Sequence, residues 1–203
     1  MQDSTVLQIR ILEDDRMKPL FVIDIETTDL DSSKGEIVEV GIARVDLVKR
    51  KVYPEYGKIV HQSDFNEDAW VFKNTDLTPS EIYRSPWGQD DIMLDLVFYL
   101  RQGYFTSYNQ EFDFTWISEK LGLEFRRVDD IMDLCTVLFD MDKRFSAQAS
   151  YLRLCQENPA NLKDSREEHR ALSDAVMESY ILLAVCEENP TVRTRLIEIL
   201  SRD

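Results

Sequence analysis

Five side chains that suit metal-assisted hydrolysis stand in three short segments of this chain. Four are carboxylates and one is an imidazole: Asp24, Glu26, Asp113, His169 and Asp174. Anionic oxygens are the ligands that Mg²⁺ and Mn²⁺ prefer, and two such ions can activate a water for attack on a phosphodiester. A histidine titrates near neutral pH and can accept the proton of that water. If the three segments converge in the fold, the sequence predicts a metal-dependent phosphodiesterase.

The first two carboxylates stand at the end of a strongly apolar segment. Residues 20–23 are Leu-Phe-Val-Ile, and Asp24 and Glu26 follow with Ile25 between them. Residues two apart in a β-strand point to the same side, so both carboxylates would lie together. Like charges this close repel each other unless a cation lies between them. An exposed strand edge is the alternative interpretation, but the apolar neighbours indicate burial, where unpaired charge is costly.

The third carboxylate, Asp113, opens a predicted helix. Taken alone it could be an ordinary aspartate of the first helical turn, stabilised by the helix dipole. Asn109 and Phe112 in the same segment could likewise be a turn residue and a core residue. Only their combination with the other two segments favours a site.

The fourth carboxylate, Asp174, lies within an apolar helical pattern, and His169 precedes it by five residues. On a regular helix that spacing turns the two side chains about 140° apart. Both can serve one site only if His169 belongs to the loop or first turn before the helix. A solvated surface histidine is the alternative.

The hydrophobic pattern predicts the elements that must position these residues. A near-continuous apolar run at 20–25 suits a buried central strand, and a polar link at 46–51 joins the next two β-rich runs into an antiparallel meander. Thr78, Pro79 and Glu81 have the spacing of a helix start with a capping box. The predicted strands are residues 20–25, 37–45, 52–60, 103–107 and 128–134, and the other predicted helices are 90–101, 112–121, 146–156, 168–186 and 191–201. This order describes a mixed sheet flanked by helices, an α/β fold. Residues 6–12 could form an extra strand or a short helix.

Composition narrows the class of protein further. The length of 203 residues suits one domain. The three cysteines are far apart, and only two histidines are present, which argues against a zinc site and favours buried, reduced thiols. The sequence contains no apolar run long enough to cross a membrane and no secretory signal pattern at its start. We therefore expect a cytoplasmic protein without a membrane partner.

The net charge of −15 is unusual for a protein that contacts nucleic acid. Bound cations could reverse the sign locally, the substrate could be very short, or a basic partner could supply the grip on phosphates. The charge alone does not choose among these explanations, but it argues against tight coating of long DNA.

The three segments together resemble the DEDDh branch of the DnaQ-like 3′→5′ exonucleases, which includes polymerase proofreading subunits, ribonuclease T and oligoribonuclease. The resemblance extends over about residues 20–186, and its motifs are Asp-x-Glu-Thr-Thr at 24–28, Asn-x-x-Phe-Asp at 109–113 and His-x-Ala-x-x-Asp at 169–174. It implies a ribonuclease H-like sheet and a single exonuclease domain at 19–203, preceded by an N-terminal extension at 1–18.

The resemblance also implies roles for individual residues. Asp24 would bridge two Mg²⁺ or Mn²⁺ ions, Glu26 and Asp174 would complete the shell of the first ion, and Asp113 would contribute directly or through water. His169 would be the general base. Thr27, Thr28 and Leu30 match positions near the bound 3′-terminal nucleotide, whereas Asn109 and Phe112 match positions that line the site.

Three functions follow for comparison. The first is a 3′→5′ exonuclease on single-stranded DNA or RNA ends that releases nucleoside 5′-monophosphates; any proofreading role would need a separate partner such as a polymerase or replication factor. The second is an oligoribonuclease-like enzyme for very short RNA, and the third is a binding module that no longer cuts.

Two segments depart from the pattern of the family that the chain resembles. Asp29 replaces the usual glycine after the paired threonines, and residues 75–78 differ from the corresponding family segment. Neither departure concerns a predicted metal ligand, so both affect the expected choice of substrate more than the expected reaction. Aromatic side chains could stack on bases or simply form core; the candidates are Tyr104, Tyr108, Phe114 and Trp116.

Overall fold

The computed structural model describes residues 17–140, 145–155 and 169–202. The expected element at 6–12 lies outside these residues. So do the last residue of the predicted helix 146–156 and the first residue of the predicted helix 168–186. The strands are β1 (Leu20–Thr27), β2 (Ile37–Asp46), β3 (Lys51–Ile59) and β4 (Tyr104–Thr106). The helices are α2 (Trp70–Asn74), α3 (Pro79–Arg84), α4 (Gln89–Leu100), α5 (Gln110–Leu121), α6 (Ile131–Leu138), α7 (Ala147–Cys155), α8 (Ala171–Glu188) and α9 (Pro190–Leu200).

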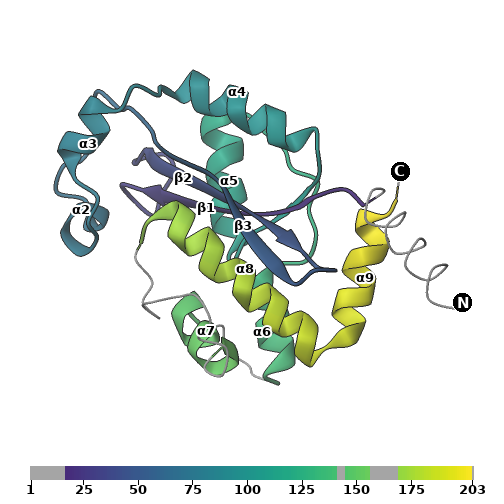
Figure 1. Ribbon diagram of the computed structural model, residues 1–203. Helices are drawn as coiled ribbons and strands as arrows, with labels where there is room; N and C mark the ends of the chain where they lie inside the picture. Colours follow the sequence, from purple (N-terminus) through teal and green to yellow (C-terminus); the bar gives the residue numbers. More distant parts are fainter. Residues whose placement is uncertain (1–16, 141–144, 156–168, 203) are drawn as a thin grey trace, which may run out of the picture.

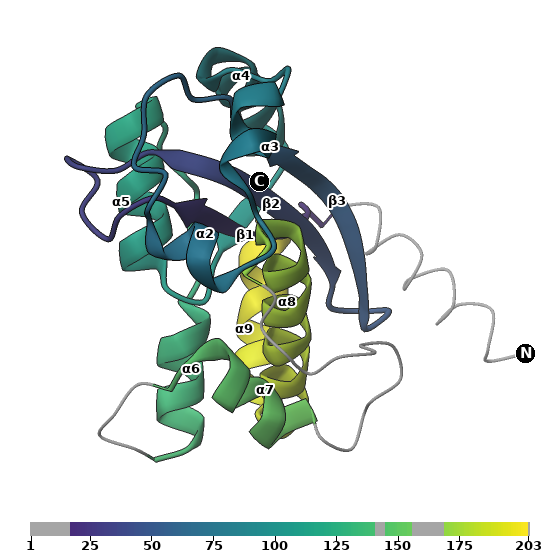
Figure 2. The same ribbon diagram turned by 90° about the vertical axis from the view of Figure 1, so that its left-hand side faces the viewer.

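The four strands form one mixed sheet in the order β3-β2-β1-β4 (Figure 1). The first three strands pair antiparallel, which confirms the predicted meander, and β4 pairs parallel to β1. Helices cover both faces of the sheet, with α4 and α5 on one side and α8 and α9 on the other (Figure 2). The predicted α/β fold is confirmed.

The alternation of side chains along β1 divides the core between the two faces. Phe21, Ile23 and Ile25 pack with residues of α4 and α5. Leu20 and Val22 point the other way and pack with residues of α6, α8 and α9. Because side chains alternate along a strand, Asp24 and Glu26 continue the row of Leu20 and Val22 on the face that α8 covers.

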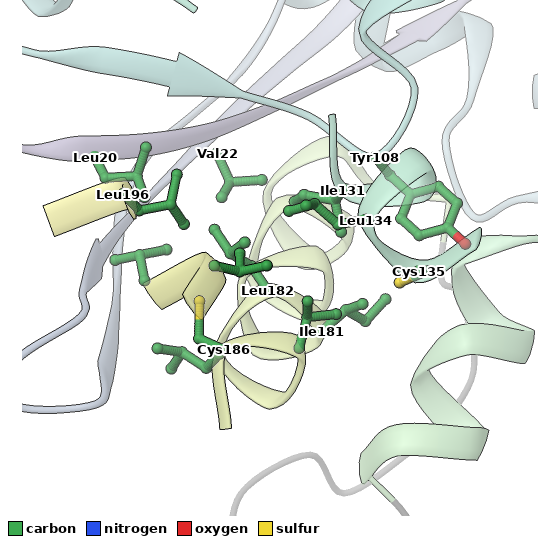
Figure 3. Packing of buried hydrophobic residues seen from close by; sticks show 14 of the residues in the cluster. Leu20, Val22, Tyr108, Ile131, Leu134, Cys135, Ile181, Leu182, Cys186 and Leu196 are labelled. Carbon is green, nitrogen blue, oxygen red and sulfur yellow. The ribbon is translucent and has the colours of Figure 1, made fainter. Parts of the chain in front are cut away.

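The apolar part of this second face is filled by one hydrophobic cluster (Figure 3). Ile181, Leu182 and Cys186 of α8 belong to the same cluster as Leu20 and Val22 of β1, and each is at most 3% exposed. Cys135 and Cys186 are buried free thiols, as expected from the sequence. The side chain of Cys155 is outside the described part of the chain.

Local capping signals explain where several helices begin and end. Thr78 and Glu81 form both hydrogen bonds of the predicted capping box at the start of α3. Gly122 ends α5 in the left-handed region, with φ of 67°, which costs little without a side chain.

The prediction of a strand at 128–134 is wrong. Only a single parallel bridge between Phe105 and Arg127 extends the sheet there. Asp130 then accepts a hydrogen bond from the amide of Asp133 and starts α6 at Ile131. This cap satisfies a free amide at the helix start, and tertiary packing buries the apolar face of the helix.

Two further differences concern the neighbourhood of the predicted site. The helix that carries Asp174 begins at Ala171 rather than at residue 168. The short helix α2 was not predicted from the sequence. No helix in the described part of the chain is both long and apolar enough to cross a membrane.

Candidate active site

The N-terminus of α8 lies close to β2, directly beside the end of β1 that carries the acidic pair. Asp24 and Glu26 are paired in register with Gly41 and Glu39 of β2. A Cβ atom at Gly41 would overlap the main chain of Ala171, so only glycine permits this approach.

An ion pair fixes the start of α8 and explains the position of His169. Both Nε and Nη2 of Arg170 donate hydrogen bonds to the Glu39 carboxylate, at 2.8–3.1 Å. The amide of Ala171 donates to Glu39 Oε2 as well. His169 therefore lies before the helix, with a left-handed φ of 49°. This conformation is uncommon for a residue with a side chain. Because His169 is not part of the helix, its side chain and that of Asp174 need not point about 140° apart, as they would on a regular helix.

The structure brings His169 together with two of the predicted carboxylates. One ligand atom each of Glu26, His169 and Asp174 lies within 4.8 Å of the others. Asp174 is buried, whereas Glu26 and His169 are partly buried. This group contains two anionic oxygens and one imidazole at distances that a single cation could span.

Asp24 supplies the observation that tests whether a cation fits this pocket. The residue as a whole is only partly buried, yet its Oδ2 atom is fully buried and has no hydrogen-bond partner among the described residues. Burial raises the pKa of Asp24 well above its usual value, and the carboxylates of Glu178, Asp113, Glu26 and Asp174 raise it further. A buried carboxylate oxygen without a partner is costly, and a divalent cation would satisfy it. The residues present therefore fit a hard divalent metal.

Asp113 is a buried group rather than an exposed capping residue. It lies in the first turn of α5 and is 4% exposed. Burial raises its pKa to about 7, although a hydrogen bond from the Ile25 backbone opposes the shift. That hydrogen bond places Asp113 beside the strand that carries Asp24 and Glu26.

A further carboxylate in this pocket, Glu178, was not predicted from the sequence. It lies one turn after Asp174 on α8 and is 4% exposed. Its Oε2 atom accepts a hydrogen bond from the amide of Tyr108 at 3.1 Å. The sequence does contain a signal for it, because a second acidic residue four positions after Asp174 in an apolar helix lies on the same helix face.

Two neighbouring cavities open beside the acidic pocket. One, of about 420 Å³, is lined by Ile25, Glu26, Thr27, Thr28, Asp29, Leu30, Trp70, Val71 and Phe112. The other, of about 490 Å³, is lined by Leu30, Asp31, Ser32, Asn109, Glu111, Phe112, Thr115 and Trp116. All five predicted substrate-binding residues line one or both cavities, and Leu30 and Phe112 line both.

The two threonines of the first motif also organise the loop that carries Leu30. Thr27 Oγ1 donates a hydrogen bond to the carbonyl of Asp29. Thr28 is buried, and its hydroxyl accepts a hydrogen bond from the amide of Glu36. These bonds hold Leu30 out into solvent, with 86% of its surface exposed.

One aromatic residue of the site was missed, and most of the suggested ones are core. Tyr108, Phe114 and Trp116 are at most 6% exposed, and Tyr104 packs against the hydrophobic cluster. Trp70 of α2, by contrast, is 58% exposed, and its ring lies edge-on to the His169 ring at 5.0 Å. Figure 2 shows α2 near the start of α8.

The chain matches one family model and is similar in fold to solved structures of an exonuclease. The RNase_T family model, described as Exonuclease, matches residues 21–182. The structure of E. coli exonuclease I in complex with a dA16 oligonucleotide has a TM-score of 0.67 at 14% identity, over 88% of this chain and 42% of that chain. The complex of the same enzyme with a dT13 oligonucleotide has a TM-score of 0.65 at 14% identity, over 88% of this chain and 43% of that one.

This chain thus spans less than half the length of these two structures, and no curated protein matches it. The match to the family model nevertheless covers most of the chain, and the mixed sheet agrees with the exonuclease fold. The chain belongs to the exonuclease family, in the DEDDh (DnaQ-like) branch of the ribonuclease H-like superfamily.

Proposed function

We propose that this chain is a metal-dependent 3′→5′ exonuclease, with residues 19–203 as its single domain, that releases nucleoside 5′-monophosphates from single-stranded DNA or RNA. The buried Oδ2 atom of Asp24, which has no hydrogen-bond partner among the described residues, carries this proposal. It lies among carboxylates that raise the pKa of Asp24, so the pocket favours a bound cation. The motif resemblance supports the direction of cleavage.

Four carboxylates would hold two Mg²⁺ or Mn²⁺ ions. Asp24, Glu26 and Asp174 would hold the ions, and Asp113 would contribute directly or through water. Bound there, the ions supply Lewis-acid stabilisation of the charge that develops on the phosphate. The close approach of Glu26 and Asp174, which have ligand atoms within 4.8 Å of each other, supports this assignment.

His169 would accept the proton of the attacking water. The water oxygen forms a bond to the terminal phosphorus, and the bond from phosphorus to the 3′ oxygen of the preceding nucleotide breaks. The leaving 3′ oxygen takes a proton from solvent, and His169 releases its own proton after the reaction. The left-handed backbone at His169 and the edge-on ring of Trp70 restrict the orientation of the imidazole.

The cavity lined by Trp70 and Leu30 would hold the 3′-terminal base. Both side chains are apolar and strongly exposed, at 58% and 86%, beside Glu26. Stacking of a base on an aromatic ring contributes about 1–3 kcal/mol and tolerates any base. The second cavity, across Leu30 and Phe112, would hold the nucleotide before it.

The charge of the two cavities favours base contacts over phosphate contacts. The described residues that line them include Glu26, Asp29, Asp31 and Glu111 but no Lys or Arg. Phosphate contacts by basic residues are what make affinity for long strands strongly salt-dependent. This observation supports a second candidate function, an oligoribonuclease-like activity on very short RNA.

Product analysis on defined oligonucleotides tests both functions. A 5′-labelled strand with Mn²⁺ should shorten from its 3′ end, and His169→Ala should lower kcat by about 10²- to 10⁴-fold while Mn²⁺ affinity is kept. An unchanged rate in His169→Ala would contradict the assigned base. Rates on a dinucleotide and on a long strand, each as RNA and DNA, separate the two candidates, whereas a binding module would release no mononucleotide.

A further inference from the structure

The helix that carries Asp174 is capped by a residue of the sheet. Arg170 stands at the N-cap position of α8, and its side chain makes no capping hydrogen bond. Ser, Thr, Asp or Asn is usual at that position, because these side chains accept hydrogen bonds from amides of the first turn. Here Glu39 of β2 takes this role, and its Oε2 atom accepts a hydrogen bond from the Ala171 amide at 3.1 Å. The place where α8 begins therefore depends on a strand residue.

The same carboxylate binds the side chain of Arg170. Nε of Arg170 donates to Oε1 at 3.1 Å and to Oε2 at 3.0 Å, and Nη2 donates to Oε1 at 2.8 Å. Glu39 is 6% exposed, and a buried carboxylate is tolerated when a well-placed cation and further hydrogen bonds compensate it. Two consecutive residues, Arg170 and Ala171, are thus held by four hydrogen bonds to a single side chain.

Glu39 also lies next to a candidate metal ligand. It is paired in register with Glu26 of β1, and side chains of residues paired in this way lie on the same face of the sheet. His169 directly precedes Arg170 in the chain, and its imidazole has a ligand atom within 4.8 Å of one in Glu26. Glu39 therefore connects the segment that carries the imidazole to the strand pair that carries the acidic site.

The backbone of His169 has a conformation that needs support from its surroundings. Its φ of 49° lies in the left-handed region, which a residue with a side chain seldom adopts unless the neighbouring structure enforces it. The bonds to Glu39 fix the chain directly after His169, and the Trp70 ring lies edge-on to the imidazole at 5.0 Å. Loss of the Glu39 contacts would let φ return to the common negative range, and the imidazole would then change its orientation.

We propose that Glu39 is a positioning residue, which acts through Arg170 and Ala171 to hold the imidazole of His169 in its reactive orientation. This inference rests on the proposed function, because it needs His169 to accept the proton of the attacking water. A misplacement of about 1 Å in a reacting group can lower a rate by about 100-fold. The contribution of Glu39 to catalysis should therefore exist only while His169 is present.

The orientation of the imidazole can be measured without metal or substrate. Glu39→Gln keeps the size of the side chain and an acceptor for the Ala171 amide but removes the charge that binds Arg170. In the metal-free full chain we expect nuclear Overhauser effects between the rings of His169 and Trp70, and we expect Glu39→Gln to weaken them. Glu55→Gln is the matched control, because it breaks another Arg–Glu pair of β2, in which Arg44 Nε lies 2.7 Å from Glu55 Oε1.

A double-mutant cycle with His169→Ala tests the catalytic role. We expect Glu39→Gln to lower kcat by about 10- to 100-fold with KM and Mn²⁺ affinity near the wild-type values. In the His169→Ala background the same substitution should change the residual single-turnover rate by less than about 2-fold, because both substitutions remove one contribution. Arg170→Lys keeps Glu39 and the positive charge but loses the two-pronged contact, so it should show smaller changes of the same kind. It replaces Glu39→Gln in the cycle if that variant does not fold.

Three results would overturn the inference. They are a wild-type kcat in Glu39→Gln, an equal loss of rate in the presence and absence of the His169 imidazole, and ring contacts of His169 with Trp70 that Glu39→Gln leaves unchanged. An equal loss in both backgrounds is what a purely structural role of Glu39 predicts. A His169→Ala variant as active as the wild type would instead overturn the base assigned under the proposed function, and the ring contacts would still report on what Glu39 positions.

Discussion

The interface between β1 and α8 has two ends of opposite character, although the same two elements form both. At one end, Leu20 and Val22 meet Ile181 and Leu182 in a closely packed apolar cluster (Figure 3). At the other end, acidic residues of the same strand face and the same helix come together; they are Asp24, Glu26, Asp174 and Glu178. The alternation of β1 side chains thus continues unbroken from hydrophobic core into acidic pocket.

The difference between the two ends separates stability from function. Apolar burial stabilises by about 25 cal/mol per Å², so the first end holds the elements together. The second end contains Asp24 Oδ2, which has no hydrogen-bond partner in the described part of the chain, and the left-handed backbone of His169. Both features destabilise the metal-free fold. Such features persist where the surrounding structure enforces them, and here the ion pair of Glu39 and Arg170 does so.

The largest expected effect is the loss of hydrolysis on removal of the Asp24 carboxylate. Asp24→Ala should lower kcat by at least about 10²- to 10³-fold, the size of effect seen when one preorganised charge-stabilising group is deleted. Asp24→Asn keeps the shape and should behave alike, with a metal-free Tm no lower than that of the wild type. The rate of mononucleotide release at saturating Mn²⁺ shows whether hydrolysis needs the Asp24 carboxylate. An unaltered rate in either variant would exclude the proposed chemistry.

A substitution at the apolar end should lower the stability of the fold and leave the activity of the folded molecule unchanged. Leu182 is fully buried, and Leu182→Ala should lower the free energy of unfolding by about 2–5 kcal/mol, because it leaves a cavity. Urea denaturation gives the stability, and the activity per folded molecule should stay near the wild-type value. Loss of activity at undiminished stability would show that the two ends are not separable.

Trp70→Ala should have a smaller effect, most of it on substrate binding. Loss of one stacked base costs about 1–3 kcal/mol, which corresponds to a rise in KM of about 5- to 150-fold. Trp87→Ala is the control, because Trp87 is also exposed but packs against Lys58. Steady-state kinetics on a short oligonucleotide distinguish them, and equal KM values in the two variants would remove Trp70 from the substrate site.

The smallest expected effect is on the pH dependence of stability without metal. Burial raises the pKa of Asp113 from 3.8 to about 7, so the folded state holds this proton more tightly than the unfolded state. The contribution of Asp113 to stability therefore falls as pH rises through this interval. Thermal unfolding in chelator should show a steeper decline from pH 5 to 7.5 for the wild type than for Asp113→Asn. Equal slopes would contradict the raised pKa.

The sequence predicted the parts of the fold that depend on local pattern. The apolar run that ends in Asp24 and Glu26 gave β1, and Thr78 with Glu81 gave the start of α3. The spacing of His169 and Asp174 required a residue outside the helix, and the structure places His169 there.

What the sequence did not predict depends on tertiary contacts. Apolar residues at 128–134 suit a strand or a helix, and the Asp130 cap decides for the helix only once packing fixes it. Trp70 lies far along the chain from His169, so nothing local indicates that their rings meet. Glu178 could have been found from its spacing to Asp174, but its proximity to Asp24 depends on how α8 crosses β1.

The central claim is that the acidic end of this interface holds divalent cations. Anomalous diffraction from crystals grown with Mn²⁺ tests it most directly. The account predicts manganese peaks in contact with the Asp24 carboxylate and within reach of Glu26 and Asp174. Well-ordered crystals with no manganese at Asp24 would contradict it.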